Sequence, residues 1–109
     1  MAYLITDLCV DVMDKSCVRE CPVDCIYEGR RSMYINPDEC IDCGACEMTC
    51  PVKAISYEPD LPPEQAHVLP RTREWVEIHG AVGGARRTGP VGVDHPDIDA
   101  LPAAPAPAP

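Results

Sequence analysis

The spacing of its eight cysteines constrains what this 109-residue chain can fold into more than any other feature. Four of them form the run Cys40-Ile-Asp-Cys43-Gly-Ala-Cys46-Glu-Met-Thr-Cys50, which a proline follows. Three thiolates spaced by two residues along a tight loop can occupy three corners of one iron–sulfur cube, whereas the fourth, on the helix that follows, points the other way. Zinc ribbons instead pair two cysteines from each of two distant knuckles. The run therefore favours iron–sulfur clusters over zinc.

All eight cysteines lie at or before Cys50, which divides the chain into a cysteine-bearing half and a cysteine-free half. A unit of about 60 residues buries too little apolar surface to be comfortably stable alone. The N-terminus has no signal-peptide pattern and no run of about 18 apolar residues occurs, so we expect a cytoplasmic protein. In a reducing cytosol, dense cysteines indicate metal binding or redox chemistry before disulfides.

A repeat relates two parts of the cysteine-bearing half. Cys-Pro-Val-Asp-Cys-Ile-Tyr-Glu at 21–28 recurs as Cys-Pro-Val-Lys-Ala-Ile-Ser-Tyr-Glu at 50–58. Two copies this alike predict a pseudo-twofold pair of (βαβ)-like units with antiparallel sheets, packed together because neither buries a face alone. Short helices are expected over 15–20 and 45–49, each ended by the next Cys-Pro. The expected strands are Tyr3–Ile5, Ile26–Glu28, Met33–Ile35 and Ile55–Tyr57, with a hairpin turn at 29–32.

The first copy lacks one ligand of the run. Counted from Cys9, the second position falls on Val12, which has no donor atom, and the next cysteines are Cys17 and Cys21. Three thiolates and an open corner suit a [3Fe–4S] cluster. With the fourth cysteine of each run crossing over, the ligand sets become Cys9, Cys17 and Cys50 for the [3Fe–4S] cluster, and Cys21, Cys40, Cys43 and Cys46 for a [4Fe–4S] cluster.

Cys25 is left over by this count. Ala54 occupies the matching position of the second copy, so we expect Cys25 to be a small packed side chain and not a ligand. A rival interpretation makes Cys25 a spare ligand during cluster damage. A second [4Fe–4S] cluster also stays open, since Asp11 or Asp14 could lend a carboxylate to a fourth iron.

The composition changes after Asp60. Nine of the thirteen prolines lie between Pro62 and Pro109. We therefore expect a core at 1–60, an extension at 61–100 and a disordered Pro/Ala-rich tail at 101–109. Within the extension, Pro70 at the first helical position and Gly80 just past the end predict a helix over 71–79. Trp75 and Ile78 would share one face, and Trp75 would anchor this helix to the core.

The charge of the chain is acidic and unevenly distributed. Residues 1–60 carry twelve Asp and Glu against five Lys and Arg, a net of −7, whereas residues 61–109 carry six against four, a net of −2. An acidic field repels nucleic acid and anionic membranes and steers a protein toward basic patches on its partners. We expect no nucleic acid and no membrane among the partners.

Three stretches, 9–17, 20–29 and 36–46, resemble the seven-iron bacterial ferredoxins, most closely those of actinobacteria. The resemblance implies the α+β two-cluster ferredoxin fold, the ligand sets given above, and a C-terminal extension that wraps the core, of which 89–94 looks like a part. It also implies redox partners such as ferredoxin-NAD(P) reductase, cytochrome P450 or 2-oxoacid oxidoreductase. Zinc-containing relatives carry a His-bearing N-terminal extension, so we expect no zinc here and three solvated histidines, His67, His79 and His95.

Together these features predict a soluble, monomeric one-electron carrier that has no substrate chemistry of its own. Backbone amides near Gly44 and Ala45 would approach sulfur closely, and Ile26, Ile41, Val52 and Ile55 look placed to exclude water from the clusters. Two other functions stay open. One is a redox or iron sensor, although no DNA-binding element is visible, and the other is a dedicated subunit of a larger oxidoreductase.

Overall fold

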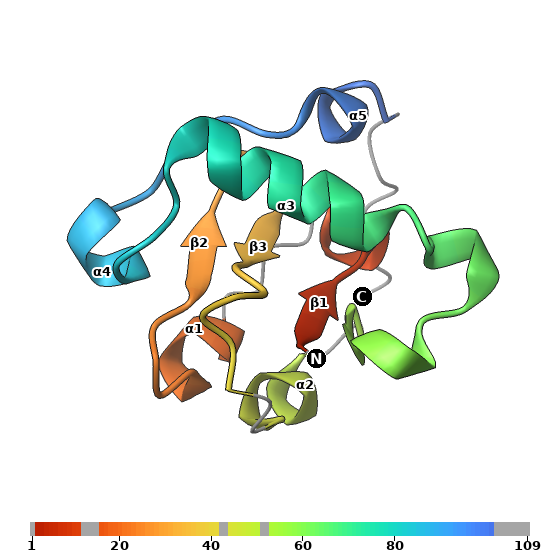
Figure 1. The fold of residues 1–109 in the computed structure, drawn as a ribbon, viewed down its shortest axis with the longest axis horizontal. Helices are drawn as coiled ribbons and strands as arrows, with labels where there is room; N and C mark the ends of the chain where they lie inside the picture. The colour runs from red at the N-terminus through yellow and green to blue at the C-terminus, as the bar shows by residue number, and fades with distance from the viewer. Residues whose placement is uncertain (1, 12–15, 42–43, 51–52, 102–109) are drawn as a thin grey trace, which may run out of the picture.

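The structure is a computed structural model that describes residues 2–11, 16–41, 44–50 and 53–101. Its regular elements follow the chain in the order drawn in Figure 1. The strands are β1 (Tyr3–Ile5), β2 (Ile26–Glu28), β3 (Met33–Ile35) and β4 (Ile55–Tyr57). The helices are α1 (Ser16–Glu20), α2 (Ala45–Thr49), α3 (Val68–His79), α4 (Ala85–Thr88) and α5 (Pro96–Asp99), with 3-10 turns at Asp7–Cys9, Glu58–Asp60 and Pro63–Gln65.

The four strands form two antiparallel two-stranded sheets. β1 pairs with β4, with Ile5 opposite Ile55, and β2 pairs with β3, with Ile26 opposite Ile35. All four strands lie where the sequence predicted them, because β-branched and aromatic residues alternate there between turn signals. The predicted turn at 29–32 joins β2 to β3, and the Gly29 amide donates to the Ser32 carbonyl at 2.9 Å.

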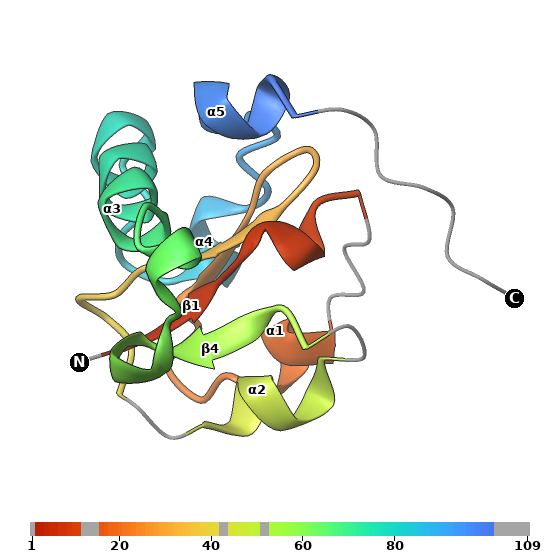
Figure 2. The ribbon, with the colours of Figure 1, turned by 90° about the vertical axis from the view of Figure 1, so that its right-hand side faces the viewer.

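Helices α1 and α2 are single short turns that pack against each other at the bottom of Figures 1 and 2. α2 covers the predicted range 45–49, and α1 covers 16–20 of the predicted 15–20, while Lys15 lies outside the described residues. Both helices end directly before a Cys-Pro step, since proline disfavours helical backbone in the residue before it. Each helix therefore places one cysteine within it and one just after its end.

The core between these elements is apolar and contains thiols. Ile5, Ile26, Met33 and Ile35 pack there, together with Ala54 and Ile55, each at most 5% exposed. Four cysteines are buried in the same cluster, namely Cys9, Cys17, Cys25 and Cys46. Three further cysteines, Cys21, Cys40 and Cys50, are partly buried against it.

Helix α3 lies against one side of the strands and contacts β1 and β3 (Figures 1 and 2). Trp75 is fully buried, stacks on Tyr34 with ring centroids 3.8 Å apart, and donates from its indole nitrogen to the Val93 carbonyl at 2.9 Å. The predicted anchoring role of Trp75 is confirmed. The prediction for Ile78 is wrong: this side chain is 63% exposed, because it lies off the buried stripe formed by Val68, Thr72, Trp75 and Val76.

Helix α3 ends as predicted and begins earlier than predicted. Gly80 follows its last residue with φ 60°, the left-handed conformation that glycine adopts at low cost, and its amide donates to the Val76 carbonyl. The helix starts at Val68, so Pro70 is its third residue. Proline is tolerated there because amides of the first turn have no acceptor within the helix.

The histidines differ in exposure. His67 is exposed and His79 is partly buried beside Trp75, with ring centroids 5.2 Å apart. The prediction of a solvated His95 is wrong, because this side chain is 5% exposed. Its Nδ1 accepts from the Asp97 amide in the first turn of α5, and its Nε2 lies 3.1 Å from Glu74. His95 therefore caps α5 against α3.

Among the described helices, none has the length and apolar character needed to cross a bilayer.

Candidate metal-binding sites

The first group of thiols gathers around Cys17. Cys17 is the second residue of α1, Cys9 ends the 3-10 turn Asp7–Cys9, and Cys50 directly follows α2. The pKa of the Cys17 thiol is raised to about 12, mainly by burial and then by like-charge repulsion from thiolates at Cys9, Cys46 and Cys50. Cys9, Cys17 and Cys46 belong to one buried cluster, and Cys50 packs against it. The thiols that act on Cys17 thus come from both copies of the repeat.

A second group of thiols lines a small cavity. Cys21, Cys25, Cys40 and Cys46 face this cavity, beside Ile26, Ile35 and Gly44. Cys43, the remaining predicted ligand, lies outside the described residues. Cys21 comes from the first copy, whereas Cys40 and Cys46 belong to the second. The described thiols at this cavity therefore come from both copies of the repeat.

Cys25 belongs to this second group by position. Its sulfur lies 3.4 Å from the Cys21 sulfur, and its side chain is 1% exposed. Burial raises the pKa of the Cys25 thiol well above its usual range, and the hydrogen bond with Cys21 adds to this. Cys25 was predicted to pack near a cluster, and the structure places it directly against the predicted ligand Cys21.

The two Cys-Pro steps are followed by the same backbone turn. The Cys25 amide donates to the Cys21 sulfur at 3.4 Å, and the Ala54 amide donates to the Cys50 sulfur at the same distance. Asp24 and Lys53, which precede these amides, have φ of 55° and 54°, the left-handed region that non-glycine residues rarely adopt. Amide donors of this kind stabilise a negatively charged sulfur and raise the reduction potential of a metal that it binds.

The donor set fits an iron–sulfur cluster. Among the described residues, which leave out Cys43, no three His, Cys, Asp or Glu side chains meet closely enough to hold one metal ion. A cluster spreads its thiolates over several irons and needs a wider cage than one ion does. Buried thiols in apolar surroundings, with amides directed at two of them, fit such a group.

Asp11, the carboxylate considered for a fourth iron, is bound by an arginine. Arg31 Nε donates to Asp11 Oδ1 and Arg31 Nη2 to Asp11 Oδ2, both at 2.8 Å. This hydrogen bond raises the pKa of the Arg31 guanidinium. Val12 and Asp14, the other residues weighed at this corner, lie outside the described part of the chain.

The prediction that four apolar side chains keep water from the thiols is correct for two of them and wrong for one. Ile26 and Ile55 are 2% and 4% exposed, which confirms their expected burial. Ile41 is 57% exposed, so the expectation that it excludes water is wrong for this residue. It lies between Cys40 and α2 and lines the cavity of the second thiol group. Val52 lies outside the described residues.

A partly buried ion pair next to Cys9 could not be predicted from the sequence. Arg71 of α3 is 7% exposed and donates from Nη2 to Asp7 Oδ1 at 2.5 Å. His67 Nε2 lies 3.5 Å from the other oxygen of the same carboxylate. The partners are 64 residues apart in the chain, so no local pattern could have indicated the pair. It fixes α3 beside the turn that carries Cys9.

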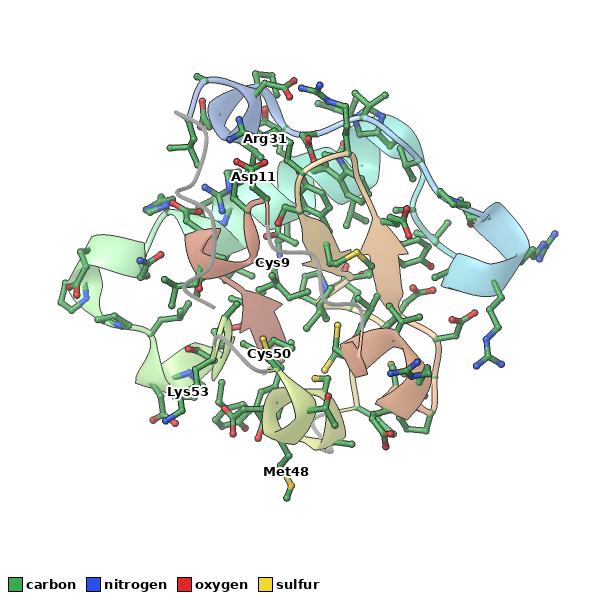
Figure 3. All side chains as sticks on the ribbon, turned by 180° about the vertical axis from the view of Figure 1, so that it is seen from behind. Cys9, Asp11, Arg31, Met48, Cys50 and Lys53 are labelled. Carbon is green, nitrogen blue, oxygen red and sulfur yellow. The ribbon has the colours of Figure 1, made fainter. Side chains whose placement is uncertain are left out.

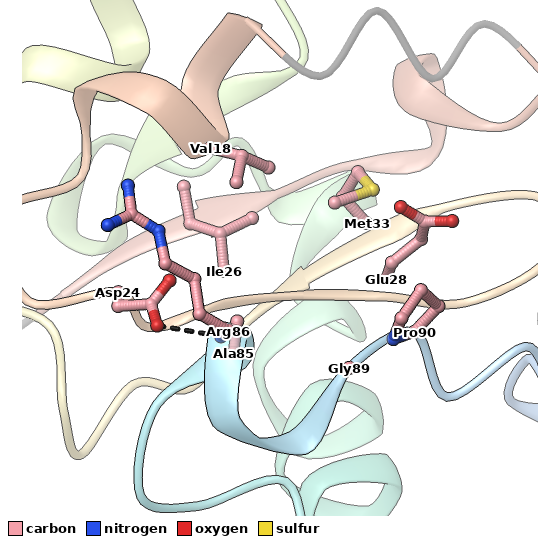
Figure 4. A pocket seen from close by; sticks show the side chains of 9 residues that line it. All are labelled: Val18, Asp24, Ile26, Glu28, Met33, Ala85, Arg86, Gly89 and Pro90. Atoms are coloured by element: carbon pink, nitrogen blue, oxygen red, sulfur yellow. Dashed lines mark hydrogen bonds between the residues drawn. The ribbon is translucent and has the colours of Figure 1, made fainter.

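A larger pocket lies between α1, the β2–β3 sheet and α4 (Figure 4). Its floor is apolar, formed by Val18, Ile26 and Met33. At its rim the Asp24 carboxylate accepts from the Arg86 amide at 2.7 Å, the bond drawn in Figure 4. No cysteine lines this pocket, so it is separate from the thiol sites.

Paired thiol groups in a small α+β fold define an iron–sulfur protein, and comparison with known proteins agrees. A family model described as a 4Fe-4S binding domain matches residues 33–56, the part that contains Cys40, Cys46 and Cys50. A ferredoxin of Streptomyces griseus is 54% identical over 100 residues, which cover 92% of this chain and 95% of that one. A ferredoxin of Mycobacterium tuberculosis H37Rv is 54% identical over 110 residues, covering 94% and 96%.

A third relative, named Ferredoxin 7Fe, comes from Hydrogenibacillus schlegelii and is 52% identical over 75 residues, which cover 69% of this chain and 96% of that one. Identity at this level over most of the chain shows the family. The chain belongs to the ferredoxins. It is an iron–sulfur electron carrier, as the sequence predicted.

Proposed function

We propose that this ferredoxin carries single electrons on two clusters, a [3Fe–4S] cluster and a [4Fe–4S] cluster. Cys9, Cys17 and Cys50 would hold the first, and Cys21, Cys40, Cys43 and Cys46 would hold the second. A bound cluster supplies a centre that changes charge by one with little change of geometry. The protein, for its part, holds the thiolates, limits the access of water and directs amides at the sulfurs.

The observation that carries this proposal is the set of thiols around Cys17. If each copy of the repeat held its own cluster, Cys21 would face Cys17 and Cys50 would face Cys46 alone. Instead the thiols that act on Cys17 are Cys9 of its own copy and both Cys46 and Cys50 of the other copy. Cys21 lies with Cys40 and Cys46 at the second cavity. Reciprocal crossing of this kind supports the ligand sets deduced from the spacing.

Cys43 and Cys25 compete for the last position at the second cavity, and we assign it to Cys43. Cys25 donates its amide to the Cys21 sulfur, and Ala54 does the same for Cys50. The equivalent turn of the second copy forms with Ala54 in this position. The Cys25 position therefore requires a backbone amide and a small side chain, and it does not require a thiol. Cys25 and Ala54 are both 1% exposed, which agrees with a packing role.

The same turns support the proposed architecture. Equivalent residues of the two copies share backbone conformation, hydrogen bonds to sulfur and burial, as expected for pseudo-twofold (βαβ)₂ units within residues 1–60. Residues 61–100 would form an extension that wraps this core, with 101–109 as a tail. Helix α3 on β1 and β3, and α4 beside β2, cover only part of the core. The α1–α2 side stays open to a partner.

The seven-iron composition has support from a relative. The ferredoxin of Hydrogenibacillus schlegelii carries 7Fe in its name, and one three-iron and one four-iron cluster together contain that number. We propose further that the protein acts in the cytoplasm as a monomer without substrate chemistry of its own. Ferredoxin-NAD(P) reductase, cytochrome P450 or 2-oxoacid oxidoreductase would be its partners, with basic docking sites that match its acidic charge.

Low-temperature EPR of anaerobically purified protein, oxidised and then reduced, tests the cluster assignment. We expect a three-iron signal in the oxidised protein, a four-iron signal after strong reduction, and metal analysis that finds iron without zinc. A protein that is EPR-silent when oxidised and contains about eight irons would instead show two four-iron clusters and overturn the proposal.

A further inference from the structure

Asp24 is held by two consecutive backbone amides of the C-terminal segment. The Ala85 amide donates to the Asp24 carbonyl at 2.8 Å, and the Arg86 amide donates to Asp24 Oδ2 at 2.7 Å. Figure 4 shows the second of these bonds, at the start of α4. Together the two hydrogen bonds form a clamp that holds both the backbone and the side chain of Asp24.

The two glycines that precede α4 bind the segment that leads into Cys40. The Gly83 amide donates to Glu39 Oε2 at 2.8 Å, and the Gly84 amide donates to the Tyr27 hydroxyl at 3.0 Å. The Tyr27 hydroxyl in turn donates to Glu39 Oε1 at 2.6 Å. Four consecutive amides, from Gly83 onward, are thus bound to residues next to the second thiol group.

The clamp acts on the peptide that carries the Cys25 amide. This amide donates to the Cys21 sulfur at 3.4 Å. The Asp24 carbonyl belongs to the same peptide, which is planar, so the bond from Ala85 fixes the direction of the Cys25 amide as well. Asp24 has φ of 55°, a conformation that costs energy for a residue with a side chain and that the clamp helps to maintain.

The second copy of the repeat has the same turn without a clamp. Lys53 has φ of 54°, and the Ala54 amide donates to the Cys50 sulfur at 3.4 Å. Within the described residues, no hydrogen bond joins Lys53 to residues 61–100. In Figure 3, Lys53 lies beside Cys50, on the opposite side of the molecule from α4. The C-terminal segment therefore holds one of the two turns and not the other.

Given the ligand sets proposed above, we propose that Asp24 is a positioning residue for the four-iron cluster, held in place by the start of α4. It keeps the Cys25 amide directed at the Cys21 sulfur. An amide donor stabilises the extra negative charge that a reduced cluster places on its sulfurs. The clamp therefore raises the reduction potential of the four-iron cluster and leaves that of the three-iron cluster unchanged.

Ala85→Pro tests the clamp without changing the charge of the protein. It removes the amide that binds the Asp24 carbonyl. Proline suits the first position of a helix, which Ala85 occupies, and Gly84 before it has ψ of 130°, as a residue before proline requires. Redox titrations of the holoprotein followed by EPR should give a lower midpoint potential for the four-iron cluster and a wild-type value for the three-iron cluster. Ala85→Gly keeps the amide and should leave both potentials at wild-type values.

Hydrogen exchange of the Cys25 amide measures its orientation without reference to electron transfer. We expect this amide to exchange about tenfold faster in Ala85→Pro than in wild type, the change expected for the loss of one hydrogen bond. The Ala54 amide is the internal control. It should exchange at the same rate in both proteins, because the C-terminal segment does not hold its turn.

A second pair of variants changes the clamp from the core side and decides the matter if Ala85→Pro does not fold. Asp24→Ala and Asp24→Asn both remove the charge, but only asparagine can accept from the Arg86 amide. The four-iron potential should be lower in Asp24→Ala than in Asp24→Asn. Lys53→Ala and Lys53→Asn make the same exchange at the turn without a clamp, and their three-iron potentials should differ less.

The proposed role of Asp24 is disproved if Ala85→Pro leaves the four-iron potential unchanged or shifts the potentials of both clusters equally. It is also disproved if the Asp24 pair differs no more than the Lys53 pair. A wild-type protein that lacks the three-iron or the four-iron EPR signal would instead disprove the proposed function.

Discussion

At Gly29 the C-terminal segment, through Asp94, packs against the β2–β3 hairpin. A Cβ at this position would lie 2.4 Å from Asp94 Oδ1 and 2.6 Å from Tyr34 Cε1. Asp94 cannot move aside cheaply, because it is 3% exposed and accepts from the Arg30 and Arg31 amides and from the Tyr34 hydroxyl. The lack of a side chain, more than backbone freedom, is what this position requires.

We therefore expect Gly29→Ala to destabilise the protein by about 1–3 kcal/mol through this overpacking. The measurement is the temperature at which the holoprotein loses its visible cluster absorbance. Gly80→Ala is the matched control, since a Cβ there meets nothing within 4 Å and only the left-handed backbone at φ 60° costs energy, about 1 kcal/mol. A Gly29→Ala protein as stable as Gly80→Ala would contradict the packing described around Asp94.

For single residues, the sequence predicted the packing of core side chains better than the solvent exposure of residues near the surface. The anchoring of Trp75 and the burial of Ile26 and Ile55 followed from residue type and local pattern. His95, Ile41 and Ile78 were misjudged, because their exposure depends on what the C-terminal segment covers. His95 lies between Glu74 and the first turn of α5, and the Glu74 contact, 21 residues away in the chain, forms only through the tertiary fold.

Helix α3 is the element that attaches the extension to the core. Trp75→Ala should cost about 3–5 kcal/mol, because it removes a fully buried indole stacked on Tyr34. Ile78→Ala on the same helix is the control and should stay within about 0.5 kcal/mol of wild type, since Ile78 is 63% exposed. Native-state hydrogen exchange of the α3 amides measures both effects. Equal loss of protection in the two variants would show that Trp75 is not the anchor.

Among the elements, those with strong local signals were predicted and those stabilised by distant contacts were not. The four strands and α2 appear at their predicted bounds, because short runs of β-branched or aromatic residues, or a Cys-Pro step, define them locally. α4 and α5 have four residues each and were missed. α4 forms where the Ala85 amide meets the Asp24 carbonyl, and α5 where Arg31 binds its last carbonyls. Neither contact leaves a pattern in the sequence.

In the molecule as a whole, the extension is tied to the core by polar contacts between distant residues. Arg71 reaches Asp7, Asp94 reaches the hairpin amides, and the Gly83 amide donates to Glu39 at 2.8 Å. On α2 the Met48 side chain is 87% exposed among the described residues. The spacing and the repeat predicted that cysteines of both copies would meet, and Cys21, Cys40 and Cys46 do line one cavity, whereas the full ligand sets stay predictions. The polar contacts between the extension and the core could not be predicted, since contacts between residues 60 or more positions apart follow no periodicity.

The exchange of cysteines between the two copies of the repeat is tested most directly by EPR of Cys50→Ala, with Cys25→Ala as the matched control. If Cys50 crosses over, oxidised Cys50→Ala lacks the three-iron signal, while its reduced four-iron signal persists. Cys25→Ala should retain both signals, because only its amide and small size are needed next to Cys21. A Cys50→Ala protein that keeps the three-iron signal and loses the four-iron one would contradict the assignment of Cys50 to the first site.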